Sequence, residues 1–171
     1  REAEKPDLGG EDEYLLDPCS SETVHWLALG AEDLILGTQT PDDGSEPFLR
    51  ARYIAPPDKI FGLARSVPHG FLDGARGISF EIRTEMPASL ILATEQRDGE
   101  RFAAMRQVDT RGKWDTVRVE FAEMNREGGG QQAVSIKPGD IKMLIIADLL
   151  PITGGSISAN TWDLRNLGGY K

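Results

Sequence analysis

The side chains that could carry out catalysis are few in kind. The chain of 171 residues holds two histidines, His25 and His69, and one cysteine, Cys19. Neither histidine lies near a serine or cysteine in a nucleophile arrangement. Carboxylates are numerous, at 28 Asp and Glu, so close pairs are expected by chance and do not by themselves indicate glycoside hydrolysis. The residue types therefore give no catalytic signature, and a hydrolase that uses acidic residues is left open as an alternative.

Charged residues alternate with apolar ones in the segment 78–83, which reads Ile-Ser-Phe-Glu-Ile-Arg. In a strand, successive side chains point to opposite faces, so if Phe80 and Ile82 face the core, Glu81 and Arg83 face water. A fixed guanidinium beside a carboxylate can form charge-assisted hydrogen bonds with a hydroxyl-rich ligand. The segment therefore predicts one polar sheet face with binding chemistry.

Two further charged residues are predicted to line the same face. Arg106 lies in an apolar stretch at 102–108, and Asp148 interrupts the most apolar run of the chain, at 141–150. A carboxylate within so apolar a run should be paired or hydrogen-bonded. We therefore predict that Glu81, Arg83, Arg106 and Asp148 bind a ligand. The alternative is that these residues form a ladder of cross-strand ion pairs, each of which contributes little to the stability of the fold.

The elements that must position these residues form a run of short strands. Between 77 and 121 the sequence contains four strand candidates, at 78–83, 90–94, 102–108 and 114–121. Asp98-Gly99 separates the second from the third and is typical of a tight hairpin turn. This pattern predicts an antiparallel meander.

The rest of the chain follows the same plan. Further strands are expected at 24–29, 33–38, 48–54, 141–150 and 156–167, and no segment has the length and periodicity of a long helix. The spacing predicts an all-β fold, a two-sheet antiparallel β-sandwich. The run at 141–150 is expected to be a central strand buried on both faces. The predicted core residues are Phe80, Ile82, Leu92, Val117, Val119, Phe121 and Ile145.

Composition limits the domain organisation and the partners. We expect an acidic arm at 1–13 and a single domain at 14–171. The net charge of −9 argues against nucleic acid, and no apolar run is long enough to insert into a membrane. A single cysteine excludes an intrachain disulfide. Because the chain begins at Arg1 and not at Met, we expect a secreted or periplasmic protein.

Three segments resemble a known family. These are 77–83 (Gly-Ile-Ser-Phe-Glu-Ile-Arg), 112–121 (Gly-Lys-Trp-Asp-Thr-Val-Arg-Val-Glu-Phe) and the closing segment 157–167. Their order and spacing are similar to those of galactose-binding-like jelly-roll domains, which include many carbohydrate-binding modules and the domains related to complex I intermediate-associated protein 30. The resemblance covers about half of the chain, from Gly77 to Leu167.

The resemblance implies a jelly-roll sandwich that binds a glycan without hydrolysing it and requires no cofactor. It also implies a structural calcium ion near the closing strand, where Asp163 resembles an aspartate of the family and Glu32 would supply a further oxygen ligand. A protein-interaction or assembly domain, which would have another protein as its partner, is the main alternative to glycan binding.

Overall fold

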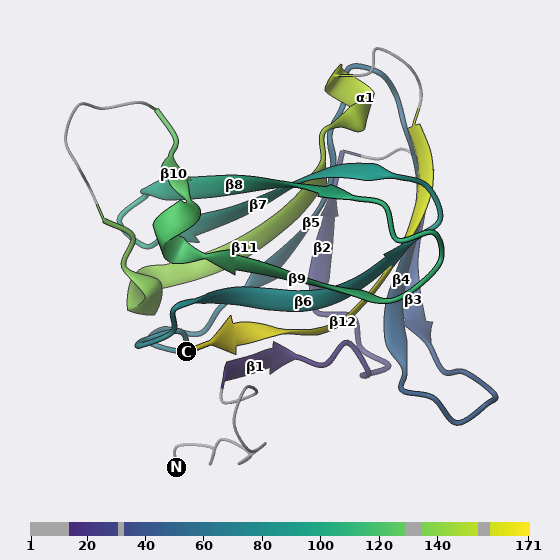
Figure 1. Cartoon of the computed structure of the whole chain (residues 1–171), viewed down its shortest axis with the longest axis horizontal. Coiled ribbons are helices and arrows are strands. Elements are labelled where there is room, and N and C mark those ends of the chain that lie inside the picture. Colours follow the sequence, from purple (N-terminus) through teal and green to yellow (C-terminus); the bar gives the residue numbers. More distant parts are fainter. Residues whose placement is uncertain (1–13, 31–32, 129–134, 154–157) are drawn as a thin grey trace.

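The computed structural model describes residues 14–30, 33–128, 135–153 and 158–171. The acidic arm predicted at 1–13 and the predicted calcium ligand Glu32 lie outside the described residues. The described strands form two antiparallel sheets that pack face to face (Figure 1). The predicted all-β sandwich is confirmed.

Sheet A has the strand order β3-β4-β12-β6-β9, and β1 also pairs with β12. Its strands are β1 (Tyr14–Asp17), β3 (Asp33–Gln39), β4 (Phe48–Ala55), β6 (Gly77–Thr84), β9 (Asp115–Glu120) and β12 (Ser158–Tyr170). The central position of β12 places the end of the chain between strands that lie far apart in sequence.

Sheet B has the strand order β10-β8-β7-β11-β5-β2. Its strands are β2 (Trp26–Leu29), β5 (Phe61–Ser66), β7 (Ala88–Gln96), β8 (Arg101–Val108), β10 (Asn125–Arg126) and β11 (Ile141–Asp148). The helices of the described residues are short: α1 (Leu150–Thr153) and 3-10 turns at Phe121–Glu123 and Pro138–Asp140. In the part of the chain that is described, no helix is long and apolar enough to cross a membrane.

The core lies between the two sheets and contains all but one of the residues predicted for it. The buried ones are Phe80, Ile82, Leu92, Val117, Val119 and Phe121. The prediction for Ile145 is wrong, because Leu144 and Ile146 point into the core and Ile145 lies half-exposed on the other face. Strand β11 is therefore fully covered on one face only.

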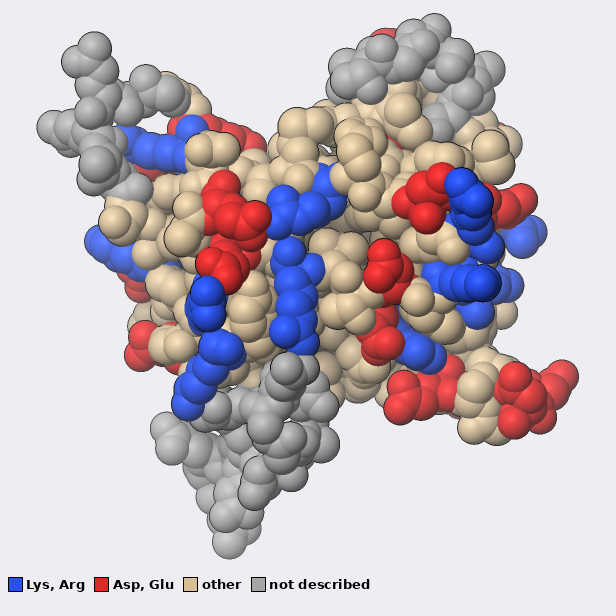
Figure 2. Space-filling view, viewed as in Figure 1, with Lys and Arg blue, Asp and Glu red and all other residues tan. Residues whose placement is uncertain are grey.

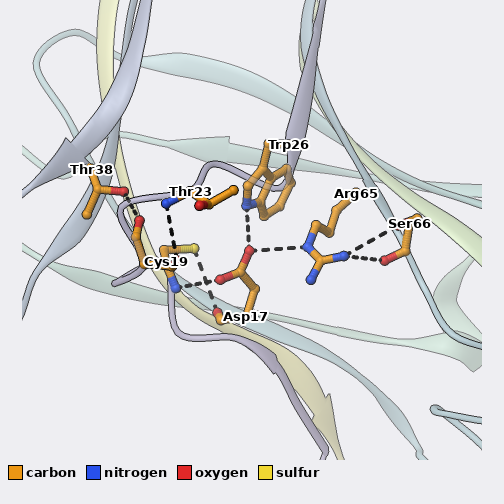
Figure 3. A network of polar contacts seen from close by, with 8 residues as sticks. Asp17, Cys19, Thr23, Trp26, Thr38, Arg65 and Ser66 are labelled. Atoms are coloured by element: carbon orange, nitrogen blue, oxygen red, sulfur yellow. Dashed lines mark hydrogen bonds and ion pairs between the residues drawn. The ribbon is translucent and has the colours of Figure 1, made fainter.

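A network of polar contacts surrounds the buried carboxylate of Asp17 (Figure 3). Asp17, at the end of β1 in sheet A, accepts hydrogen bonds from Nε1 of Trp26 at 3.0 Å and from Nε of Arg65 at 3.2 Å. Trp26 and Arg65 belong to β2 and β5 of sheet B, so one carboxylate joins the two sheets. The backbone N–H of Cys19 donates to the same carboxylate at 2.7 Å, and the Cys19 side chain is buried.

Candidate functional site

The two outward-facing surfaces of the sandwich differ in chemistry. The outer face of sheet B points to the top of Figure 1, and Figure 2 shows the molecule hollowed there, between the ends that carry β10 and α1. Leu27, Ile91, Met105 and Ile145 lie on it. Among the described residues, this face carries no aromatic side chain that could stack on a ligand.

The outer face of sheet A, in contrast, carries a row of charged residues across three neighbouring strands. Arg50 of β4 pairs with Asp163 of β12, which pairs with Arg83 of β6. Nε of Arg50 lies 2.8 Å from Oδ1 of Asp163, and Nη2 of Arg83 lies 2.8 Å from Oδ2. Asp163 is only 4% exposed, while both arginines are partly open to solvent. The buried carboxylate thus holds two guanidinium groups in fixed positions at the surface.

Asp163 also keeps the neighbouring cation charged. Its hydrogen bonds raise the pKa of Arg50 above the ordinary arginine value. Each guanidinium still has N–H groups that Asp163 does not use, because arginine carries five N–H donors in a rigid fork. These donors can reach a ligand placed over the row.

Trp114 lies next to this row, immediately before β9, and is half-buried. The guanidinium carbons of Arg83 and Arg165 lie 4.6 Å and 4.1 Å from the centre of its ring. The ring of Phe48 meets it edge-on at 5.6 Å. Cations at this distance are attracted to the ring face, which stabilises the position of the indole.

Arg165 is fixed from its other side by Glu81. Its Nε and Nη2 lie 3.2 Å and 3.1 Å from the two carboxylate oxygens of Glu81. Asn166, which has a positive φ of 55°, donates from its side-chain amide to the same carboxylate. The predicted residue Glu81 therefore positions Arg165, which in turn contacts Trp114.

A hollow of 560 Å3 opens beside these residues. One wall consists of Arg50, Arg83, Arg165, Phe48 and Trp114; the other is the loop 39–46, which supplies Gln39, Thr40, Pro41, Asp42, Asp43, Ser45 and Glu46. Hydrogen bonds from the hydroxyl and N–H of Ser45 lower the pKa of Asp43. The hollow therefore combines cationic donors, carboxylate acceptors and aromatic edges, which is the chemistry of a site for a polar ligand with apolar patches.

The four predicted ligand-binding residues do not come together. Glu81 and Arg83 lie on the outer face of sheet A, as their alternation indicated. Arg106 belongs to β8 of sheet B, and its Nη2 donates to Oε1 of Glu123 at 2.7 Å. Asp148 is buried in the core and accepts a hydrogen bond from Tyr53. Its prediction as a surface residue failed because it points inward with Leu144 and Ile146.

The predicted calcium site stays a prediction. Glu32 lies outside the described residues, and both carboxylate oxygens of Asp163 accept hydrogen bonds from arginines. Within the described ranges, no group of three or more His, Cys, Asp or Glu residues is placed to hold a metal ion. Thermal unfolding with excess calcium and with a chelator would test the site, because a bound structural ion raises the melting temperature.

Sequence reasoning missed Arg50, Arg165 and Trp114 as members of one site. A signal for Arg50 was present, since Phe-Leu-Arg-Ala-Arg-Tyr at 48–53 alternates in the same way as 78–83. These residues meet through the pairing of β12 with β4 and β6 and of β9 with β6, and no local sequence pattern indicates this strand order.

Solved structures with the same arrangement of strands provide the comparison. A family 11 carbohydrate-binding module from Clostridium thermocellum, solved in complex with a β-1,3-1,4-mixed-linked tetrasaccharide, superposes with a TM-score of 0.66 at 16% identity, over 92% of this chain and 94% of that one. An exo-β-agarase matches with a TM-score of 0.67 at 12% identity, over 91% of this chain but 25% of the agarase. A family 30 carbohydrate-binding module gives a TM-score of 0.53 at 10% identity, over 94% and 84%.

The chain has the jelly-roll fold of these carbohydrate-binding modules. No protein-family model matches it, and no curated protein matches it in sequence. The predicted fold class and the structural resemblance are thus confirmed, and at these identities the likeness establishes the fold alone.

Proposed function

We propose that the chain is a non-catalytic carbohydrate-binding module that holds a glycan on the polar outer face of sheet A. The observation that carries this proposal is the hollow of 560 Å3 in which Arg50 and Arg83, fixed by the buried Asp163, stand beside Trp114. The fold neighbours support the class of ligand, since one was solved with a mixed-linked tetrasaccharide and another is an agarase.

The residues of the hollow match the chemistry of a sugar chain. Sugar hydroxyls donate and accept hydrogen bonds, so the guanidinium N–H groups serve as donors and the carboxylates of Asp42 and Asp43 as acceptors. The C–H faces of sugar rings pack against aromatic surface, which the half-buried Trp114 provides.

The charges of the site favour an uncharged glycan. Asp163 and Glu81 already pair the arginines, and three acidic residues of the loop, Asp42, Asp43 and Glu46, form the opposite wall. A sulfated or uronic chain would meet this acidic wall and be repelled. A few directed hydrogen bonds and one stacking contact correspond to dissociation constants of about 10⁻³ to 10⁻⁵ M, or about −4 to −7 kcal/mol.

A role in binding polysaccharide also bears on where the protein works. Polysaccharides of cell walls and matrices lie outside the cytoplasm, so this function requires export. That agrees with the expectation of a secreted or periplasmic protein.

Calorimetry against a panel of plant, algal and bacterial polysaccharides tests the proposal. We expect at least one neutral polysaccharide to bind without turnover. Arg83→Ala should weaken that binding at least about tenfold, the factor that ~1.4 kcal/mol represents. The matched control is Arg101→Ala, because Arg101 makes a similar ion pair with Glu95 at 2.7 Å but lies on sheet B.

Two outcomes would overturn this assignment. If the whole panel fails to bind, a protein-interaction domain becomes the better hypothesis. If Arg83→Ala binds as tightly as the parent, the glycan does not occupy the hollow beside Trp114.

A further inference from the structure

The hollow beside Trp114 is one of three that lie on the same face of sheet A. A second, of 220 Å3, has a lining that includes Arg50, Arg52, Arg83, Glu85 and Thr161. A third, of 540 Å3, has a lining that includes Asp33, Ile35, Arg52, Ile54, Glu85 and Thr161. Neighbouring hollows share lining residues, so the three are continuous.

The shared residues fix their order. Arg50 and Arg83 line both the hollow beside Trp114 and the second one. Arg52, Glu85 and Thr161 line both the second and the third. We call this series the sheet A track; it begins beside Trp114 and ends beside Ile35 and Ile54.

Strand register gives the track its direction and length. Phe48, Arg50, Arg52 and Ile54 follow one another along the outward-facing positions of β4. Successive outward positions are about 7 Å apart, so the track measures about 20 Å from the first to the last. That length accommodates several units of a linear sugar chain lying along the strands.

Chemistry changes from one end of the track to the other. The Trp114 end and the middle offer guanidinium groups, carboxylates and a hydroxyl. The far end adds exposed apolar surface, because Ile35 is 68% exposed and Ile54 is 46% exposed there, next to Asp33, Arg52 and Glu85. An isoleucine side chain forms no hydrogen bond, so a sugar unit placed over these two residues gains from them only through an apolar surface of its own.

The exposure of Ile35 is unusual for its position. It lies on β3, the edge strand of sheet A, and edge strands normally carry charged residues at outward positions to prevent association with other chains. The next outward residue is Gly37, and no atom lies within 4 Å of where its Cβ would be. On the edge strand β3, the track is therefore bordered by the exposed side chain of Ile35 and by the open space over Gly37.

From this continuity we infer that the sheet A track binds an internal stretch of a linear neutral glycan, and that the unit over Ile35 and Ile54 presents an apolar face or substituent, such as an anhydro bridge, a methyl ether or an acetyl ester. This inference rests on the proposed function. It adds that affinity depends on chain length and that one end of the track selects for an apolar group.

Calorimetry with two oligosaccharide series tests the inference. The probes are agaro-oligosaccharides, whose anhydrogalactose units carry an apolar bridge, and mixed-linkage β-glucan oligosaccharides, which lack it. We expect affinity to rise from the trisaccharide to the hexasaccharide, and to rise more in the agaro series. A hexasaccharide that binds no more tightly than the trisaccharide would overturn the track while leaving the proposed function intact.

A variant at the far end of the track separates its contribution from that of the Trp114 end. Ile35→Ser should lower the affinity for the agaro-hexasaccharide about tenfold and leave the trisaccharide unchanged. Ile35 faces solvent, so an unchanged melting temperature will show that the variant folds.

The control for Ile35→Ser is Leu27→Ser, a leucine that is 64% exposed on the outer face of sheet B. We expect it to bind like the parent. A loss of binding in Leu27→Ser would place the glycan on sheet B and overturn the inference, as would an Ile35→Ser variant that binds the hexasaccharide normally. If neither series nor any polysaccharide of the panel binds, the proposed function itself fails.

Discussion

The phenolic hydroxyl of Tyr53 donates a 2.6 Å hydrogen bond to Oδ2 of Asp148, and this buried bond joins the two sheets. Tyr53 belongs to β4 of sheet A and Asp148 to β11 of sheet B, and both are fully buried. The other carboxylate oxygen of Asp148 accepts from the N–H of Leu150 at 3.0 Å. The charge that interrupts the most apolar run of the chain is therefore structural.

Removing the hydroxyl should destabilise the fold. Tyr53→Phe leaves Oδ2 of Asp148 buried without its partner, which costs about 1–3 kcal/mol of the free energy of unfolding. Urea unfolding measures the change. Tyr170→Phe is the matched control, because the structure gives its hydroxyl no hydrogen-bond partner among the described residues, and it should change stability by less than about 0.5 kcal/mol. Equal effects of the two substitutions would contradict the role of the Tyr53–Asp148 bond.

The buried thiol of Cys19 and the buried phenol of Tyr53 should make the fold less stable at alkaline pH. Burial, and then the charge of Asp17, raises the pKa of the Cys19 thiol; burial, and then the hydrogen bond to Asp148, raises the pKa of Tyr53. The unfolded chain ionises these groups at about pH 8.5 and about pH 10, while the folded chain keeps them protonated. The two protonated groups therefore make their full contribution to the free energy of unfolding below about pH 8.5, and this free energy falls as the pH rises further.

Urea unfolding at a series of pH values checks this dependence. The double variant Cys19→Ala, Tyr53→Phe lacks both groups and should show a flatter alkaline limb than the parent. A parent whose stability does not change up to pH ~11 would contradict the prediction.

Alternation predicted the faces of β6 but could not predict those of β11, for a physical reason. In β6 one face is buried and the other is exposed to solvent. Phe80 and Glu81 therefore differ in polarity, which shows which alternate residues face the core. In β11 both faces are apolar, because Ile145 lies on the apolar outer face of sheet B, opposite Ala64 and Ala93. A uniformly apolar run does not show which of its alternating side chains point into the core. Ile145 was therefore assigned to the core and Asp148 to the surface, both incorrectly.

The candidate site was only partly predictable, because it depends on strand order. The sequence indicated that Glu81 and Arg83 face outward, and they do. It could not indicate that Asp163 enters between Arg50 and Arg83, since residues 50, 83 and 163 meet only through the pairing of β12 with both β4 and β6. Asp163 was predicted as a calcium ligand on resemblance, and the structure places two arginines on its carboxylate.

Phe121 offers a test of the core. It begins the short 3-10 turn after β9, and its ring is buried between the sheets. Phe121→Ala should lower the free energy of unfolding by about 3–5 kcal/mol, because it removes apolar contacts and leaves a cavity. Met105→Ala, on the outer face of sheet B, is the control and should cost less than about 0.5 kcal/mol. A loss for Phe121→Ala no larger than for the control would show that the ring does not pack as described.

The last prediction concerns Asp163, which both stabilises the fold and orients the site. Asp163→Asn keeps the shape of the side chain but removes the charge shared by Arg50 and Arg83. Because these guanidinium groups are partly exposed, water will compensate for some of the loss, and we expect a decrease of about 1–3 kcal/mol in the free energy of unfolding.

Glycan affinity should fall in the same variant at a temperature where it is fully folded, since the arginines lose the anion that fixes their positions. Glu100→Gln is the matched control: Glu100 pairs with Arg126 through two bonds of 2.6 Å and 2.7 Å, but the pair lies at the β8–β10 edge, away from the sheet A track. It should leave glycan binding unchanged. If Asp163→Asn loses stability but retains full affinity, the carboxylate supports the sheet only, and the arginines do not depend on it to bind sugar.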